Sequence, residues 1–193
     1  MTENWQALLK EREYNDLLLE WNQKINLVSR KKTEIFDLIE DSKLFFGAID
    51  LKPGLKILDL GTGGGIPGIV IKINYPETEI TFVDSIQKKI NVVTDIIKKM
   101  KLENAEAVCT RAEELSRNEK YTAAFDYVVA RSVAPLQDLA KWSKDLIKPG
   151  GKLVTVKGGD ISGEIQKTKK QSYVKGIVMK DSNDKKIITV MFS

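Results

Sequence analysis

Residues 57–71 read ILDLGTGGGIPGIVI and place an acid, Asp59, just before a cluster of glycines. An apolar run of strand length precedes the cluster, and a second apolar run follows Pro67, so the segment predicts a strand, a loop and the start of a helix. Glycine adopts positive φ easily and lets a ligand approach the main chain, and proline suits the first turn of a helix. The segment therefore predicts a loop that binds a nucleotide-like ligand at the carboxyl edge of a sheet.

The glycines can be matched to a dinucleotide-binding motif. Gly63, Gly65 and Gly68 fit the pattern GxGxxG. Asp84 follows about 20 residues later, where an acid binds the adenosine ribose in such folds. NAD is therefore one candidate ligand.

The same loop also fits a second pattern, in which Asp59 is followed by glycines at alternate positions, Gly61, Gly63 and Gly65. This pattern resembles motif I of class I S-adenosylmethionine (SAM) methyltransferases. SAM carries a sulfonium and an amino cation and has no pyrophosphate, so a carboxylate at the strand end favours SAM and repels a dinucleotide. Asp84, at the end of the next predicted strand, can accept hydrogen bonds from both ribose hydroxyls. We therefore favour SAM over NAD.

The composition excludes several other kinds of chemistry. The 193 residues include no histidine and one cysteine, Cys109. Imidazole-based metal sites, Ser-His or Cys-His relays and internal disulfides are therefore ruled out, and we expect no metal. The amino terminus lacks a signal-peptide core, and no stretch approaches the ~18 apolar residues of a membrane span. We expect a cytoplasmic monomer without membrane contact.

The charge is mildly basic and is gathered in short runs. Lys and Arg total 31 against 27 acidic residues, a net charge of +4. Such runs are either solvated helix faces or contacts with nucleic-acid phosphates. They are Arg30, Lys31 and Lys32; Lys88 and Lys89; Lys98, Lys99 and Lys101; and Lys167, Lys169 and Lys170.

The predicted elements form an amino-terminal helical extension, residues 1–52, packed on a core of residues 53–193. Apolar spacing predicts a helix over 4–25, and a second helix capped by Thr33 and ending at Gly47. Beyond Pro53, strands are expected at 56–60, 79–83, 105–109, 125–130 and 152–156, and helices at 66–74, 86–100, 113–116 and 136–147. This alternation predicts an α/β fold with a mostly parallel, doubly wound sheet. Residues 176–180 and 186–192 flank a turn and predict an antiparallel hairpin that closes the sheet.

The ordered segments DLGTGGGIPGIVI, VDSIQKKINVV, TRAEEL, VVARSVAPL and LVTVKG resemble the rRNA small subunit methyltransferase G family. WNQKINLVS and the pair Asp41 and Ser42 extend the resemblance over most of the chain. The resemblance implies a Rossmann-like class I SAM-dependent methyltransferase. It also implies methylation of N7 of one guanine in a loop of 16S rRNA near the decoding site, in free rRNA or in the small ribosomal subunit.

The resemblance also assigns residues. It implies that Gly61 and Ile66 line the cofactor, that Ala112 and Glu113 meet its adenine, and that Arg131 lies where cofactor and substrate meet. With the motif residues, the expected cofactor set is Asp59, Gly61, Gly63, Gly65, Ile66, Asp84, Ala112, Glu113 and Arg131. Arg111, Arg131 and Lys157 match the family's basic substrate positions. An arginine bound to both O6 and N7 would block the attacking atom, so we expect these residues to hold phosphate or O6 alone.

Other functions stay open from the sequence. A SAM methyltransferase for another RNA, a small molecule or a protein would carry the same glycine loop, and a noncatalytic RNA-binding or NAD-binding module is a further alternative. Trp142, Tyr127 and Phe125 could stack on a base, but their apolar surroundings favour core positions.

Overall fold

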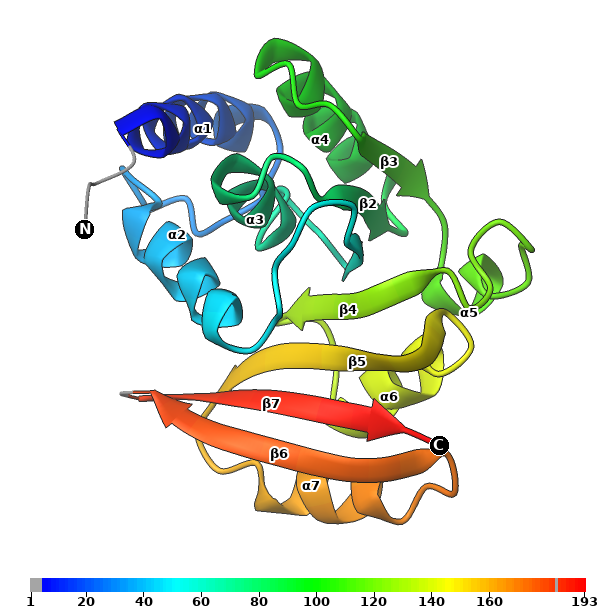
Figure 1. The fold of residues 1–193 in the computed structure, drawn as a ribbon. Helices are drawn as coiled ribbons and strands as arrows, with labels where there is room; N and C mark the ends of the chain where they lie inside the picture. Colours follow the sequence, from blue (N-terminus) through cyan, green and yellow to red (C-terminus); the bar gives the residue numbers. More distant parts are fainter. Residues whose placement is uncertain (1–4, 183) are drawn as a thin grey trace.

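The computed structural model describes residues 5–182 and 184–193, which form a seven-stranded sheet with helices on both faces (Figure 1). The strand order is β3-β2-β1-β4-β5-β7-β6. The first five strands pair in parallel, and β7 runs antiparallel between β5 and β6. The strands are β1 (Lys56–Leu60), β2 (Glu79–Asp84), β3 (Ala105–Cys109), β4 (Phe125–Arg131), β5 (Ile147–Gly158), β6 (Val174–Ser182) and β7 (Lys185–Phe192). The predicted parallel sheet with a carboxyl-terminal antiparallel hairpin is confirmed.

The central strands β1 and β4 are apolar on both faces, and helices cover each face of the sheet there. Ile57 and Val129 point into one core cluster, and their neighbours Leu58 and Val128 point into the other, as the alternation of strand side chains requires. The first cluster lies under α1 (Trp5–Lys24), α2 (Phe36–Lys43), the 3-10 turn η1 (Leu44–Gly47), α3 (Gly68–Asn74) and α4 (Gln87–Lys99). The second lies under α5 (Ala112–Leu115), α6 (Leu136–Ser143) and α7 (Ser162–Lys169).

The amino-terminal helices share their core with the sheet. Tyr14 and Leu18 of α1 are fully buried in the same cluster as Ile57 of β1. Polar contacts fix α1 as well: Trp21 Nε1 donates to Asp95 Oδ2 of α4 at 2.8 Å. The helical extension therefore packs directly on α3, which follows the glycine loop, and on α4, while the boundary at residue 52 stays a prediction.

The second helix begins later than the sequence predicts. Thr33 does not cap it; the helix begins at Phe36 after Ile35. The Ile35 N–H donates instead to Asn15 Oδ1 of α1 at 2.8 Å, so a tertiary contact fixes this end of the helix. The predicted start of the first helix at Asn4 lies outside the described residues.

Two boundaries on the second face also differ from expectation, and one helix on that face was not predicted. The predicted helix 136–147 ends at Ser143, and Ile147 instead begins β5, paired with Phe125. The Pro-Gly-Gly segment, residues 149–151, therefore lies within β5, where the register with β4 shifts. Helix α7 was not predicted, because its sequence SGEIQKTK has almost no apolar residues.

Candidate active site

A cavity of about 300 Å³ opens at the carboxyl ends of β1, β2, β3 and β4. This is the edge at which ligands bind in open α/β sheets. The predicted site residues in its wall are Gly61, Asp84, Arg111, Ala112 and Glu113. The other predicted residues, Asp59, Gly63, Gly65, Ile66, Arg131 and Lys157, are not part of the wall. Of these five wall residues, Gly61 and Asp84 were predicted from motifs, and Arg111, Ala112 and Glu113 from the family resemblance.

The glycine loop has the backbone that its sequence predicts. Gly61 and Gly63 have φ values of +72° and +59°, which residues with a Cβ adopt only with strain. A Cβ on Gly61 would lie 2.6 Å from Cγ2 of Val133, whereas one on Gly63 would meet nothing within 4 Å. Gly61 is therefore needed for the packing of the loop after β4, and Gly63 leaves its outer side open.

Asp59 lies beneath the loop and not in the cavity wall. Its side chain is fully buried, and Oδ2 accepts hydrogen bonds from Thr62 Oγ1 at 2.7 Å and from the Gly68 N–H at 2.9 Å. Oδ1 is buried without a hydrogen-bond partner among the described residues. Burial raises the pKa of Asp59 to about 6, against the opposing effects of these hydrogen bonds and of the Arg131 cation. Asp59 therefore shapes the loop and places a titratable acid next to the site.

The same contact disfavours a dinucleotide. Gly68 is the first residue of α3, and its N–H is already bound by Asp59. A pyrophosphate would need free amides at this helix end and would be repelled by the acid. The antiparallel β7 also departs from the parallel six-stranded dinucleotide-binding sheet.

Asp84 faces the cavity, as predicted from its position at the end of β2. Its Oδ2 accepts from the Gly63 N–H at 3.1 Å, and its Oδ1 accepts from the Ile86 N–H at 3.0 Å. Lys89 Nζ lies 3.6 Å from Oδ2. Each carboxylate oxygen can accept a further hydrogen bond, so Asp84 can bind the two hydroxyls of a ribose.

Apolar side chains in the cavity wall were not identified from the sequence. Ile86 and Val133 are large apolar residues with exposed fractions of 47% and 37%, and both line the cavity. Trp142, expected in the core, is half-buried and lines it too. The exposure of Trp142 could have been predicted from helical spacing, because this residue lies outside the buried face of α6 that contains Leu136 and Leu139.

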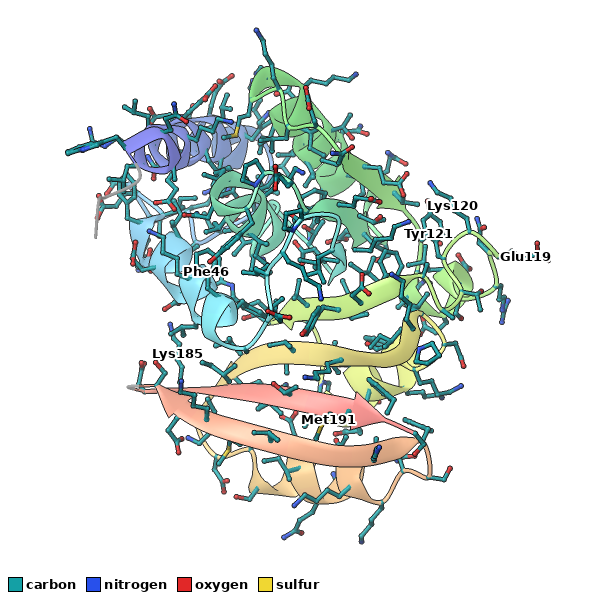
Figure 2. All side chains as sticks on the ribbon, in the orientation of Figure 1. Phe46, Glu119, Lys120, Tyr121, Lys185 and Met191 are labelled. Atoms are coloured by element: carbon teal, nitrogen blue, oxygen red, sulfur yellow. The ribbon has the colours of Figure 1, made fainter. Side chains whose placement is uncertain are left out.

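Arg131 ends β4 and lies in an ionic contact between distant segments. Its Nη1 lies 3.5 Å from Asp41 Oδ2 of α2, and the same oxygen pairs with Lys185 of β7. Figure 2 shows Lys185 at the end of the hairpin nearest α2. The Arg131 side chain is 17% exposed, so the guanidinium is held in place while part of it stays accessible.

Lys157 holds the loop between β4 and α6. Its Nζ donates to the Ala134 carbonyl at 2.9 Å and pairs with Glu164 Oε2 at 2.9 Å. Glu164 also accepts from the Leu136 N–H at 2.6 Å. This loop carries Val133 over Gly61, so Lys157 acts on the cavity through the loop.

Tyr14 is a site residue that sequence reasoning missed. Its hydroxyl donates to the Gly64 carbonyl at 3.0 Å, and burial raises the pKa of Tyr14 well above its usual value, which keeps the hydroxyl protonated. Leu18, one turn along α1, packs so closely on Gly64 that a Cβ there would lie 2.6 Å from Leu18 Cδ1. Helix α1 therefore fixes the outer part of the glycine loop.

Residues 5–182 and 184–193 contain no group of three or more His, Cys, Asp or Glu side chains that could hold a metal ion. Within the same residues, every helix is too short or too polar to cross a membrane.

Comparison with known sequences gives one consistent result. A family model described as rRNA small subunit methyltransferase G matches residues 8–187. Proteins named ribosomal RNA small subunit methyltransferase G are 39% identical in Clostridium novyi and 45% identical in Chlorobaculum tepidum, over 85% and 79% of this chain. The aligned regions cover 68% and 69% of those two proteins, and 63% of a 44% identical relative from Chlorobium luteolum. The chain thus spans about two thirds of the length of these relatives.

Solved structures with the same fold are distant in sequence. A ribosomal protein L11 methylase from Lactobacillus delbrueckii subsp. bulgaricus is 16% identical with a TM-score of 0.63, covering 81% of this chain and 78% of its own. A SAM-dependent methyltransferase from Aquifex aeolicus is 15% identical with a TM-score of 0.58, covering 79% of this chain and 90% of its own. At this identity the similarity establishes the Rossmann-like methyltransferase fold alone.

Proposed function

The chain belongs to the rRNA small subunit methyltransferase G family, and from this premise we propose that it transfers a methyl group from SAM to N7 of one guanine in 16S rRNA. The observation that carries the proposal is the cavity between the glycine loop and Asp84, with a buried carboxylate beneath the loop. This arrangement suits a cationic nucleoside better than a pyrophosphate.

The residues present fit SAM. Asp84 offers free lone pairs for the ribose hydroxyls, and Ile86, Val133 and Trp142 provide an apolar surface of the kind that adenine covers. Oδ1 of Asp59 has no hydrogen-bond partner in the part of the chain that the structure describes, and it favours a cation near the loop. When bound, SAM supplies an electrophilic methyl group on its sulfonium.

The chemistry requires little proton transfer. Guanine N7 already holds an unshared pair in the plane of the ring, so no general base has to remove a proton before attack. The task of the protein is to align the acceptor with the donor, and orientation of this kind contributes several orders of magnitude to rate. The lack of histidine in the chain is consistent with such a reaction.

The basic residues divide into two roles. Arg111 is exposed in the cavity wall, and Arg131 is held by Asp41 at the edge of the site. We assign both to phosphate or O6 of the substrate, which leaves N7 free. Lys157 is a positioning residue, because both of its contacts fix the loop that carries Val133.

The substrate base must leave its stack before its N7 can reach the site, as in other enzymes that act on a single base. Phosphate contacts should supply much of the affinity for rRNA, so that binding weakens steeply with salt. We propose that the protein acts in the cytoplasm as a monomer, on free rRNA or on the small subunit.

The test is methylation of rRNA from cells that lack this gene. Purified protein is incubated with labelled SAM and with either free 16S rRNA or small subunits, and N7-methylguanine is mapped by chemical cleavage. We expect one labelled guanine. Label in small molecules or in protein, but not in rRNA, would refute the proposal.

The role of Arg131 has its own test. Arg131→Ala should slow single-turnover methylation at saturating rRNA and SAM, whereas Arg117→Ala, at an exposed position after α5, should not. Normal single-turnover methylation by Arg131→Ala would remove this assignment.

A further inference from the structure

The four basic runs of the sequence lie in different parts of the fold. Lys88 and Lys89 lie in the first turn of α4, where Lys89 lines the active-site cavity. Helices α4 and α7 follow the carboxyl ends of β2 and β5 and run back across the sheet, so their last turns point toward the opposite edge. Lys98 and Lys99 end α4, and Lys169 and Lys170 end α7. These runs lie away from the cavity. The run Arg30, Lys31 and Lys32 belongs to neither helix.

This run borders a separate hollow of about 530 Å³, which we name the α1 groove. Its lining comes from α1 and from the loop that follows α1. The lining residues are Leu19, Asn22, Gln23, Arg30, Lys32 and Thr33.

Two buried asparagines of α1 fix the shape of that loop. Asn22 Oδ1 accepts from the N–H groups of Leu27 and Val28 at 2.9 and 3.0 Å. Asn15 Oδ1 accepts from the Ile35 N–H at 2.8 Å. Both asparagines are buried, where an unsatisfied amide would be costly. The loop therefore presents its cations in a preformed arrangement.

Of the two cations that line the groove, Arg30 is exposed and Lys32 pairs with Asp37. Lys31 lies between them in the chain, outside the lining, and is exposed. Two consecutive exposed cations on a fixed backbone suit a partner with closely spaced negative charges, and a preorganised site loses less conformational entropy on binding.

The α1 groove and the glycine loop both contact α1. Leu18, next to Leu19 of the groove, packs against Gly64, and Asn22 follows one turn later, about 6 Å along the helix. A polyanion whose base reaches the site could therefore continue over the groove.

We propose that the phosphate backbone of the rRNA beside its target guanine binds along the α1 groove, through Arg30 of its lining and the adjacent exposed Lys31. This inference rests on the proposed function, because it assigns a second contact surface to the same substrate. The groove adds affinity and orientation; it takes no part in the chemical step.

The test is the double variant Arg30→Gln with Lys31→Gln, which keeps the Lys32–Asp37 pair. The dissociation constant for 16S rRNA is measured over a range of salt concentrations. The slope of its logarithm against log salt should fall by about 1.5, since each phosphate contact contributes about 0.7 to 0.9. Single-turnover methylation at saturating rRNA and SAM binding by calorimetry should match the wild type.

The matched control is Lys169→Gln with Lys170→Gln, which removes two adjacent exposed cations from the end of α7. It should leave the salt slope unchanged. An unchanged slope in the groove variant, or an equal fall in both variants, would overturn the inference. If either of these results is found while the wild-type protein methylates rRNA, the groove assignment fails and the proposed function stands. If the wild-type protein does not methylate rRNA, the proposed function itself fails.

Discussion

Replacing Asp59 by asparagine should change how the stability of the fold depends on pH. Burial raises the pKa of Asp59 from 3.8 to about 6 in the folded protein. This difference of about two units corresponds to about 3 kcal/mol, at 1.36 kcal/mol per unit. The carboxyl is buried with one oxygen unpartnered among the described residues, so the cost comes from holding a desolvated charge.

The sign follows from proton binding. Below the unfolded pKa of 3.8, both states hold the proton and ionisation of Asp59 has no effect on stability. As pH rises from there to about 6, the unfolded chain releases its proton while the folded protein keeps it, so the free energy of unfolding decreases. Above about 6 both are ionised and the loss of about 3 kcal/mol is complete.

The Asp59→Asn variant is the matched comparison because its side chain cannot ionise. The carbonyl oxygen of the new amide can still accept from Thr62 and Gly68, the partners of Asp59 Oδ2. The NH₂ group of that amide would replace the unpartnered Oδ1 and cost about 1 to 3 kcal/mol, which does not vary with pH. The test is therefore the difference between the two proteins in how their unfolding free energy changes with pH, and not the difference at any single pH.

The assay is urea unfolding of both proteins at constant ionic strength across the range from the unfolded to the folded pKa and beyond. The difference in unfolding free energy should shift by about 3 kcal/mol in favour of Asp59→Asn as pH rises. Arg131 and Asp84, which also act on this carboxyl, are present in both proteins. Parallel stability curves over this range would refute a buried, proton-holding Asp59.

Three further changes test the site. Adding SAM should quench tryptophan fluorescence in the wild type and in Trp21→Phe but not in Trp142→Phe. If SAM still quenches the fluorescence of Trp142→Phe, the indole ring of Trp142 does not contact the ligand. Gly68→Ala should lower the unfolding free energy by about 2 to 3 kcal/mol, because its Cβ would lie 2.5 Å from a buried ring carbon. Gly63→Ala, with open space around it, should lower it by about 1 to 2 kcal/mol because of its positive φ. Equal losses of unfolding free energy in urea would contradict this packing. Tyr14→Phe should cost about 1 to 3 kcal/mol and weaken SAM binding in calorimetry, and an unaltered affinity would mean that the hydroxyl does not order the loop.

The fold was predictable where local pattern and packing agree. The bounds of β1 and β3 match the sequence prediction. β1 is a short, mostly apolar segment, and in β3 Glu106 alternates with apolar residues, and both patterns are typical of strands. The junction of α6 and β5 was not predictable in this way. Ile147 is buried in either arrangement, so hydrophobicity alone cannot assign it to a helix or a strand.

Site residues were likewise predictable from local sequence but not from contacts between distant segments. Gly61 and Asp84 were found from short motifs, because each lies directly at the end of a strand, whereas Ala112 was assigned through the family resemblance alone. Tyr14 and Asp41 were not assigned their roles, since each acts across a contact between segments far apart in the sequence. The spacing of apolar residues along a helix predicts which face is buried, but it does not indicate which loop that face will contact.

The position of β7 between β5 and β6 has a consequence for the order of folding. β6 is made before β7, yet its hydrogen-bonded neighbour in the sheet is β7 and not β5. During synthesis, β6 must therefore wait without a partner until residues 185–192 emerge from the ribosome. Formation of β7 also brings Lys185 to Asp41. In a nascent chain that still lacks β7, Asp41 would therefore pair with Arg131 but not with Lys185.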